Sequence, residues 1–250
     1  MCRHLAYLGP AMPLADLVLT PPHSLLRQSW APADMRGGGT INADGHGVGW
    51  YPTPGAAPVR HRTASPLWTD TSFASWAGAV SAGAVLAAVR SATVGMPVAE
   101  SANAPFLAEG WLFSHNGKVT GWPHSLAALA DTLPATDLLT LDAATDSALL
   151  WALLRRRLRA GEPAATAVAD LVRTVAAAAP DSRLNLLLTD GTNIVATTWW
   201  HSLSVRHTGN SVTVASEPTD DERDWQPVPD RHLMLANSST LDIIPLEDHR

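Results

Sequence analysis

Residues 184–200, LNLLLTDGTNIVATTWW, place a tight-turn dipeptide between two β-rich runs. The runs Leu184–Thr189 and Asn193–Trp200 are rich in Leu, Ile, Val and Thr, as strands are. Asp190-Gly191 between them is a strong hairpin signal. A second hairpin is predicted at Thr208-Gly209-Asn210, between two further β-rich runs. This part of the chain is therefore expected to form antiparallel β-sheet.

The other β-rich runs lie on both sides of a helical middle section. Further strands are expected at Arg3–Leu8, Gly47–Tyr51, Val59–Thr63, Ala84–Arg90, Gly110–Ser114, Ser202–Arg206, Ser211–Ala215 and His232–Leu235. Helices are expected at Ala144–Ala160 and from Pro163 to about Ala179, with shorter ones near Asp70–Val80 and Ser125–Leu133. Because strands, helices and strands follow one another without βαβ alternation, the pattern predicts one α+β domain with antiparallel sheets.

Composition and charge exclude several classes of protein. Only 16% of the residues are charged, and the net charge is −6. The dense basic run is confined to Arg155–Arg157 and Arg159, so no nucleic-acid partner is expected. The longest apolar run, Trp76–Val89, is interrupted by glycines and is shorter than the about 20 residues of a membrane span. With no signal peptide at the start, a cytoplasmic protein without a membrane partner is expected, and assembly into a homo-oligomer stays open.

Cys2 is the single cysteine, which excludes an internal disulfide and a cysteine-based metal cluster. Removal of Met1 would leave one residue with a thiol and a free α-amine, whose ordinary pKa values are about 8.5 and about 7.7–8.0. That residue would combine a nucleophile with its general base. Taken alone, an ordinary cysteine near the chain start is the simpler interpretation.

Six motifs in order change that interpretation. They are MCRHLAYLG at 1–9, INADGHGVGWY at 41–51, AAVRSAT at 87–93, SHNGKV at 114–119, TDSALL at 145–150 and ASEP at 215–218. Together they resemble the class II, or N-terminal-nucleophile, glutamine amidotransferase domain. The resemblance implies one such domain over residues 2–250, with Met1 removed. It also implies a four-layer αββα sandwich, in which helices flank two antiparallel sheets.

A narrower likeness points to one branch of that family. The segments AAVRSATVGMPV, RLNLLL, ATTWW and PDRHL are similar to the γ-glutamyl hydrolases of ergothioneine biosynthesis. That likeness implies cleavage of the γ-glutamyl amide of γ-glutamyl hercynylcysteine S-oxide, through a γ-glutamyl thioester on Cys2. No cofactor is implied.

Asn116 and Gly117 are the candidate oxyanion hole. A side-chain amide and a backbone N–H are donors suited to that task, and the resemblance gives the matching residues this role. From the residues alone, an Asn-Gly turn between strands is the favoured interpretation. The neighbouring His115 is expected to be structural.

Arg90, Thr93 and Asp146 are the candidate substrate-binding residues. A guanidinium binds a carboxylate with two hydrogen bonds, and the resemblance assigns Arg90, with Thr93 beside it, to the α-carboxylate of the glutamyl group. It assigns Asp146 to the α-ammonium. The alternatives are an arginine at a strand end and an acid that caps a helix.

Contacts with the leaving group are less well defined by the sequence. The Gly-rich segment 42–50 is expected to line the nucleophile by resemblance, although His46 stands where many relatives have Trp. The substrate implied by the resemblance carries a trimethylammonium group. Trp50 and Trp122 are candidates to contact it, because an indole face attracts a quaternary ammonium. The ten histidines form neither HxH nor HExxH, so no metal site is expected.

The expected function is that of a stand-alone amidohydrolase, because the motifs occupy nearly the whole chain. Two alternatives remain at this stage. The first is a glutaminase, or another γ-glutamyl peptide hydrolase, that acts with a separate partner subunit and supplies ammonia to it. The second is a non-catalytic binding module that retains the fold.

Overall fold

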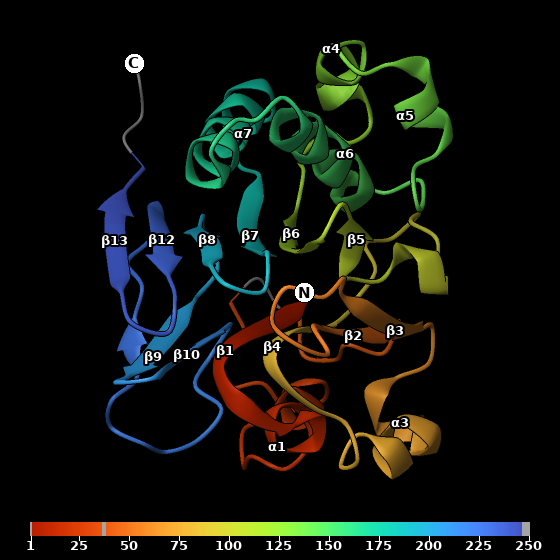
Figure 1. The fold of residues 1–250 in the computed structure, drawn as a ribbon. Coiled ribbons are helices and arrows are strands. Elements are labelled where there is room, and N and C mark those ends of the chain that lie inside the picture. The colour runs from red at the N-terminus through yellow and green to blue at the C-terminus, as the bar shows by residue number, and fades with distance from the viewer. Residues whose placement is uncertain (1, 37–38, 247–250) are drawn as a thin grey trace.

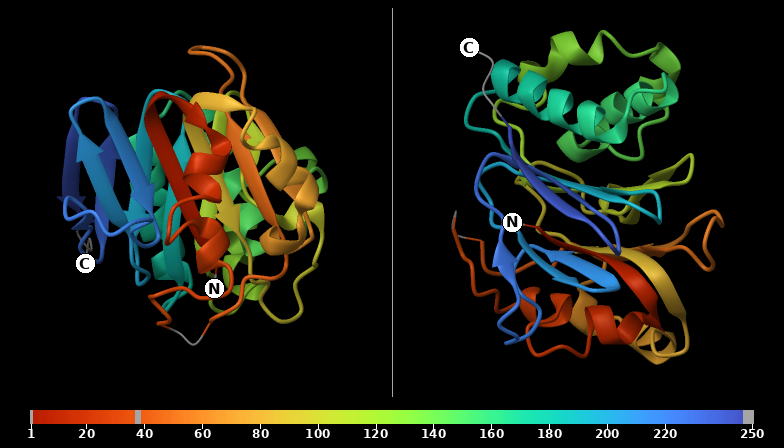
Figure 2. Two further views of the ribbon diagram at one scale, coloured as in Figure 1. Left: turned by 90° about the horizontal axis from the view of Figure 1, so that it is seen from below. Right: turned by 60° about the vertical axis from the view of Figure 1, so that its left-hand side comes forward.

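Two antiparallel β-sheets lie face to face in the computed structural model, which describes residues 2–36 and 39–246 (Figure 1). Helices α6 and α7 cover the outer face of one sheet, and α1 and α3 lie against the other (Figure 1). The order of layers is therefore helix, sheet, sheet, helix (Figure 2). The predicted α+β class and the four-layer αββα sandwich are confirmed.

The seven-stranded sheet has the order β11-β9-β10-β1-β4-β2-β3. Its strands are β1 (Arg3–Pro13), β2 (His46–Trp50), β3 (Val59–Thr63), β4 (Ser81–Val89), β9 (Ser204–Thr208), β10 (Ser211–Ala215) and β11 (Gln226–Pro227). The six-stranded sheet has the order β13-β12-β8-β7-β6-β5. Its strands are β5 (Phe106–Ala108), β6 (Trp111–Lys118), β7 (Arg183–Thr189), β8 (Ile194–Thr198), β12 (His232–Ala236) and β13 (Leu241–Pro245).

The helices are short except for two. They are α1 (Leu14–Val18), α2 (Leu25–Gln28), α3 (Thr71–Trp76), α4 (Ala127–Ala130), α5 (Ala135–Leu139), α6 (Asp146–Arg159) and α7 (Ala164–Ala178), with single 3₁₀ turns η1 (Leu67–Thr69), η2 (Glu100–Ala102) and η3 (His124–Leu126). Among the helices of the described ranges, none is long and apolar enough to cross a membrane.

Helix α6 shows how closely local sequence controls this middle section. Its expected start is confirmed, because the Thr145 hydroxyl caps it by accepting the N–H of Ala148 at 3.2 Å. Leu149, Leu150 and Leu154 are buried against the six-stranded sheet and α7. The predicted range of 144–160 is thus correct to within two residues at the start and one at the end.

Several element predictions need correction. β6 continues to Lys118, so Asn116 and Gly117 lie inside a strand and do not form a turn after it. α3 ends at Trp76 and does not reach Val80. The sequence pattern missed α1, α2, α5, β5, β11 and β13; most are too short to show a periodic pattern.

Strand alternation decides which residues reach the gap between the sheets. On β1, Ala6 and Leu8 pack between the sheets, whereas Leu5 and Tyr7 pack against the helices α1–α3. His4 faces the gap as well, since its ring lies 3.1 Å from the hydroxyl of Ser114 on β6. Cys2 precedes His4 by two residues and so extends this inward-facing row.

Glycines on β2 let the second sheet approach closely. A Cβ at Gly47 would lie 2.4 Å from the carbonyl oxygen of Ala104, and one at Gly49 would lie 2.8 Å from the side chain of Leu112. The alternating His46, Val48 and Trp50 then point to the other face, toward α3. The Gly-rich segment therefore serves close packing between the sheets.

Candidate active site

Cys2 lies part-buried at the start of β1, beside a narrow cavity between the sheets. Its Sγ donates to the carbonyl oxygen of Ser91 at 3.8 Å. The cavity is lined by Cys2, His46, Ala88, Val89, Arg90, Ala102, Asn103, Ala104, Phe106, Ser114, His115 and Ser147. Its volume of about 20 Å³ accommodates about one water molecule, so a larger substrate has to widen it.

Asn116 is fully buried on β6, on the face toward the seven-stranded sheet. Its Nδ2 lies 3.5 Å from the hydroxyl of Ser216, which accepts the backbone N–H of His4 at 3.0 Å. Asn116 is therefore linked through one hydroxyl to the strand that begins beside Cys2. Its Oδ1 has no hydrogen-bond partner within the described part of the chain. The donor that an oxyanion hole needs is the Nδ2 amide group, which carries a second N–H besides the one directed at Ser216.

Gly117 occupies a position where no side chain fits. A Cβ there would lie 1.9 Å from the carbonyl oxygen of Arg183 and 2.6 Å from Nε2 of His115. His115 itself connects three elements: Nδ1 lies 2.9 Å from the hydroxyl of Ser147, and Nε2 lies 2.8 Å from the carbonyl oxygen of Arg183. His115 also lines the cavity of Cys2, and its structural role stays a prediction.

Arg90 directly follows β4 and lines the cavity with Cys2. Arg90 is 9% exposed, and its Nη1 donates to the carbonyl oxygen of Pro97 at 2.9 Å. The turn after it is held by Asp44, whose carboxylate accepts the N–H of Ala92 at 2.7 Å. Thr93 is exposed and accepts the N–H of Met96 with its carbonyl oxygen. Arg90, and not Thr93, is thus placed in the wall beside the thiol.

Asp146 is the first residue of α6 and is buried. One carboxylate oxygen accepts the N–H of Val119 at 2.8 Å, and the other accepts the N–H of Ser147 at 2.7 Å. Because Val119 follows β6, this carboxylate fixes the end of the strand that carries Asn116 to the start of α6. The next residue, Ser147, reaches the cavity wall. Asp146 therefore has a structural role at the edge of the site and keeps lone pairs for a further donor.

A buried ion pair behind Cys2 was not predicted. Arg3 is 1% exposed, and its Nε lies 3.9 Å from a carboxylate oxygen of Glu217. Arg3 also donates to the carbonyl oxygen of Asp34, while Glu217 accepts the N–H groups of Ala33 and Asp34 at 2.9 and 2.8 Å. The residue next to the nucleophile is thereby anchored. The ASEP motif was the available signal, since it contains both Ser216 and Glu217.

His4 and His201 are two further buried histidines that the sequence did not mark as candidates. Burial in the first place lowers the pKa of His4 to about 3, and His115 and Arg3 act in the same direction. Burial, followed by the charge of Arg183, lowers the pKa of His201 to about 3. Both rings are therefore neutral near pH 7, which keeps added positive charge away from Cys2.

Of the three candidate leaving-group contacts, His46 lines the cavity of Cys2, and the two tryptophans lie apart from it. The ring of His46 packs against Phe73 and His61 on the α3 side of the seven-stranded sheet. Trp50 packs on the same side, 5.8 Å from the ring of Trp76. Trp122 contacts the core between the six-stranded sheet and its helices. Neither tryptophan is among the residues that line the cavity of Cys2 in the described structure.

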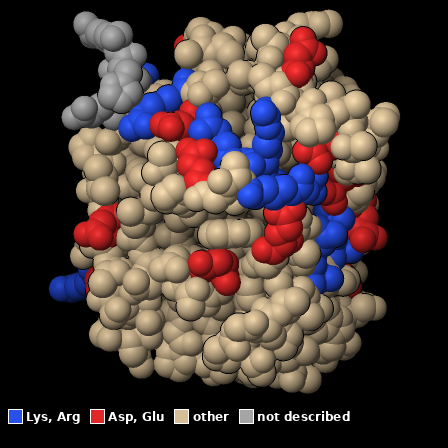
Figure 3. Space-filling model, turned by 45° about the horizontal axis from the view of Figure 1, so that its top comes forward, with Lys and Arg blue, Asp and Glu red and all other residues tan. Residues whose placement is uncertain are grey.

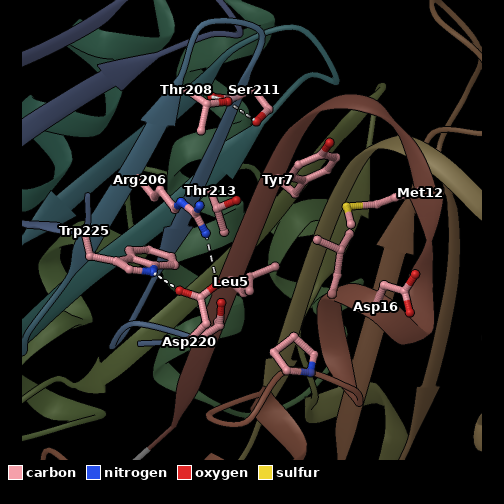
Figure 4. A pocket seen from close by; sticks show the side chains of 13 residues that line it. Leu5, Tyr7, Met12, Asp16, Arg206, Thr208, Ser211, Thr213, Asp220 and Trp225 are labelled. Carbon is pink, nitrogen blue, oxygen red and sulfur yellow. Dashed lines mark hydrogen bonds and ion pairs between the residues drawn. The ribbon is translucent and has the colours of Figure 1, made fainter. Parts of the chain in front are cut away.

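A second pocket lies on the outer face of the seven-stranded sheet (Figure 4). There Arg206 donates to Asp220 at 3.0 Å and to Asp224 at 2.9 Å, and Trp225 donates to Asp220 at 2.8 Å. Figure 4 shows the side chains of Arg206, Asp220 and Trp225 turned toward one another. Because its arginine and facing carboxylates are paired with each other, this pocket is a weaker candidate than the cavity of Cys2.

The basic run on α6 is interrupted by acids. Arg155 and Arg159 both lie within 3.3 Å of the carboxylate of Asp137, and Arg157 lies 3.1 Å from that of Glu162. Figure 3 shows blue and red side chains side by side on this face. The run therefore does not form a continuous basic surface of the kind that binds nucleic acid.

Comparison with known proteins defines the family. The profile described as "Glutamine amidotransferases class-II" matches residues 24–208. The fold, the cavity beside Cys2 and this match agree, and the chain belongs to the class II glutamine amidotransferases.

Curated relatives narrow the comparison. The chain is 43% identical to the gamma-glutamyl-hercynylcysteine sulfoxide hydrolase of Mycolicibacterium smegmatis, over 98% of this chain and all of that protein. It is 42% identical to the protein of the same name from Mycobacterium tuberculosis, over 99% of this chain and 97% of that one.

Solved structures show the same fold at lower identity. The glutamine aminotransferase class-II domain protein from Silicibacter pomeroyi has a TM-score of 0.66 and 22% identity, with 98% of this chain and 100% of that one covered. Glutamine phosphoribosylpyrophosphate amidotransferase from B. subtilis has a TM-score of 0.68 and 15% identity. The match covers 98% of this chain but only 49% of that enzyme, so the likeness is confined to about half of it.

Proposed function

We propose that this chain hydrolyses the γ-glutamyl amide bond of γ-glutamyl hercynylcysteine S-oxide and releases glutamate and hercynylcysteine S-oxide. The observation that carries the proposal is the identity of 41–43% to curated hydrolases of that name, over nearly the full length of the chain. The placement of Cys2, Arg90 and Asn116 around the gap between the sheets supports it.

The first half of the reaction transfers the glutamyl group to Cys2. With Met1 removed, the α-amine of Cys2 takes the thiol proton and Sγ attacks the γ-carbonyl carbon. Met1 itself lies outside the described residues. Nδ2 of Asn116 and the N–H of Gly117 stabilise the tetrahedral oxyanion. The C–N bond then breaks, the α-amine returns the proton to the departing amine, and a γ-glutamyl thioester remains.

Water completes the second half. The α-amine removes a proton from water as its oxygen attacks the thioester carbonyl, and the C–S bond breaks to release glutamate and the thiol. Throughout, Arg90 binds the α-carboxylate and Asp146 receives the α-ammonium. These two charges restrict the site to an unmodified glutamyl head, and charge-assisted hydrogen bonds are each worth about 1.5–3 kcal/mol.

The test compares γ-glutamyl substrates by mass spectrometry. γ-Glutamyl hercynylcysteine S-oxide, glutathione and glutamine are incubated separately with the purified protein. We expect the highest kcat/KM with the first substrate. A clear preference for glutamine, together with a co-purifying synthetase subunit, would instead identify an ammonia-supplying glutaminase. No turnover of any of the three would identify a binding module.

The nucleophile is tested separately. We expect the intact mass of the mature protein to lack one methionine, and Cys2→Ala to abolish turnover while the protein stays folded. Full activity of a protein that retains Met1 would overturn the N-terminal-nucleophile mechanism.

A further inference from the structure

Three potential metal ligands converge on the α3 side of the seven-stranded sheet, and one of them, His46, also lines the cavity of Cys2. They are His46 on β2, His61 on β3 and Asp70, which precedes α3. His46 and His61 lie on one face because β2 and β3 pair His46 with Thr63 and Val48 with His61. One ligand atom from each residue lies within 4.8 Å of the others.

The hydrogen bonds of His46 fix its tautomer. Nδ1 lies 3.1 Å from the carbonyl oxygen of Ser65, and because a carbonyl only accepts, Nδ1 carries the hydrogen. In a neutral ring with its hydrogen on Nδ1, Nε2 presents a lone pair. A backbone carbonyl that holds the other ring nitrogen in this way is the usual arrangement for a histidine that binds a metal.

That lone pair faces another acceptor. Nε2 of His46 lies 3.3 Å from Oδ2 of Asp70. It has no hydrogen-bond partner within the described ranges. Because His46 is only 1% exposed, bulk water does not supply one either. Two lone pairs in contact repel each other unless a cation lies between them. Nε2 of His61 makes a hydrogen bond of 3.2 Å with the same oxygen, which a metal ion between the two groups would replace.

The two distances suit a tetrahedral ion. Zn²⁺ binds histidine nitrogen and carboxylate oxygen at about 2.0–2.2 Å, so two of its ligands lie about 3.3–3.5 Å apart. Oδ1 of Asp70 is occupied separately, since it accepts the N–H of Phe73 at 2.8 Å. Asp70 would thus bind a metal through Oδ2 alone while it still caps α3. The side chain of His61 is 29% exposed, which leaves a path for an ion and for a water as fourth ligand.

We propose that His46, His61 and Asp70 form a binding site for a divalent transition-metal ion, with Zn²⁺ as the ion that their ligand set and spacing suit best. The ion would join β2, β3 and the start of α3. His46 pairs with Val89, the residue before Arg90. The site therefore stiffens the strand edge that leads to the cavity of Cys2, without taking part in the reaction.

The test measures Zn²⁺ binding and does not depend on turnover. Chelator-stripped full-length protein is titrated with Zn²⁺ by calorimetry, and the bound metal is counted by elemental analysis. We expect one ion per chain. Loss of a second-shell partner alone costs about 10–100-fold in metal affinity, so His61→Ala and Asp70→Asn should weaken binding at least that much. Asp70→Asn retains an oxygen to cap α3, and the melting temperature in chelator checks that both variants fold.

Two control variants locate the ion. His23 forms an exposed pair with Asp221 at 2.9 Å, so His23→Ala removes a His–Asp pair elsewhere and should leave binding unchanged. Cys2→Ala removes the competing thiol and should also retain the ion. The proposal is overturned if the protein binds no Zn²⁺, if His61→Ala and Asp70→Asn bind it as tightly as the parent, or if the ion is lost with Cys2.

Discussion

Asn116 on β6 lies directly opposite Asn185 on β7, yet only Asn185 has its side chain satisfied by the backbone. Nδ2 of Asn185 donates to the carbonyl oxygen of His201 at 2.9 Å, and Oδ1 accepts the N–H groups of Trp199 and His201 at 2.9 and 3.2 Å. Asn116 has one long contact, to Ser216, and an Oδ1 without a partner among the described residues. Two identical side chains in one ladder therefore differ in how completely their hydrogen bonds are formed.

We expect opposite effects when each asparagine is replaced. Asn116→Ala should lower kcat by about 10²–10³-fold, the usual cost of one oxyanion donor, with little change in melting temperature. Asn185→Ala leaves buried backbone groups unpaired and should lower the free energy of unfolding by about 1–3 kcal/mol or more. Kinetics and thermal denaturation of both variants check this. A stable, fully active Asn116→Ala protein would remove Asn116 from the oxyanion hole.

Gly117→Ala should damage both stability and rate. The new Cβ would lie 1.9 Å from the carbonyl oxygen of Arg183, so β6 must shift, and overpacking typically costs about 1–3 kcal/mol or more. Gly209→Ala is the matched control, because no atom lies within 4 Å of its Cβ position. Denaturant unfolding measures both variants. Equal stability of the two would show that β6 yields without cost.

Two substitutions of Asp146 distinguish its structural role from its electrostatic role. Asp146→Asn retains an oxygen that can accept the N–H of Val119 but loses the charge, so we expect near-parental stability and a lower kcat/KM for every γ-glutamyl substrate alike. Asp146→Ala should also lose stability, by about 1–3 kcal/mol, because a buried N–H is left unpaired. Kinetics on several substrates checks the assignment. A change only in the preference among leaving groups would contradict it.

Arg90→Lys tests recognition of the α-carboxylate. Lysine keeps the charge but lacks the planar fork that binds a carboxylate through two hydrogen bonds. The loss of one charge-assisted bond of about 1.5–3 kcal/mol corresponds to about a 10–100-fold fall in kcat/KM. Arg27 is a suitable control because its guanidinium lies over the ring of Trp30, and Arg27 is not among the described residues that line the cavity of Cys2. If Arg90→Lys were as active as Arg27→Lys, Arg90 would not bind the substrate.

The buried histidines should make stability depend on pH. His201 has its pKa lowered to about 3 in the folded state, against about 6.5 in an unfolded chain. Between these values the unfolded state binds a proton that the folded state does not, so the free energy of unfolding falls as the pH decreases below about 6.5. One such histidine contributes a slope of up to about 1.4 kcal/mol per pH unit.

The variant His201→Gln isolates this contribution. We expect its free energy of unfolding to fall less steeply than that of the parent between about pH 7 and about pH 5, where most carboxylates stay ionised. Urea unfolding across that interval measures the two slopes. Identical slopes would mean that His201 is protonated in the folded protein as readily as in the unfolded chain.

The elements that local sequence controls were predicted correctly. The Asp190-Gly191 turn joins β7 to β8, and the Thr145 cap begins α6. Turn chemistry, capping and periodic burial depend on neighbours within a few residues, so they are visible in sequence. The single cysteine at position 2 and the Asn116-Gly117 pair were equally visible, and their catalytic roles stay predictions for the variants above.

Tertiary structure alone decided which distant residues meet. β1 lies between β4 and β10, so that Leu5 pairs with both Ala87 and Ala215, and no local pattern encodes such partners. The pairing of β2 with β3 and β4 likewise turns Trp50 toward α3 and brings His46 and His61 to Asp70. These outcomes depend on strand order and on which face of a strand each side chain occupies. The strand order, and the face of the sheet on which each side chain lies, depend on how the whole chain buries its apolar surface. A short stretch of sequence does not contain that information.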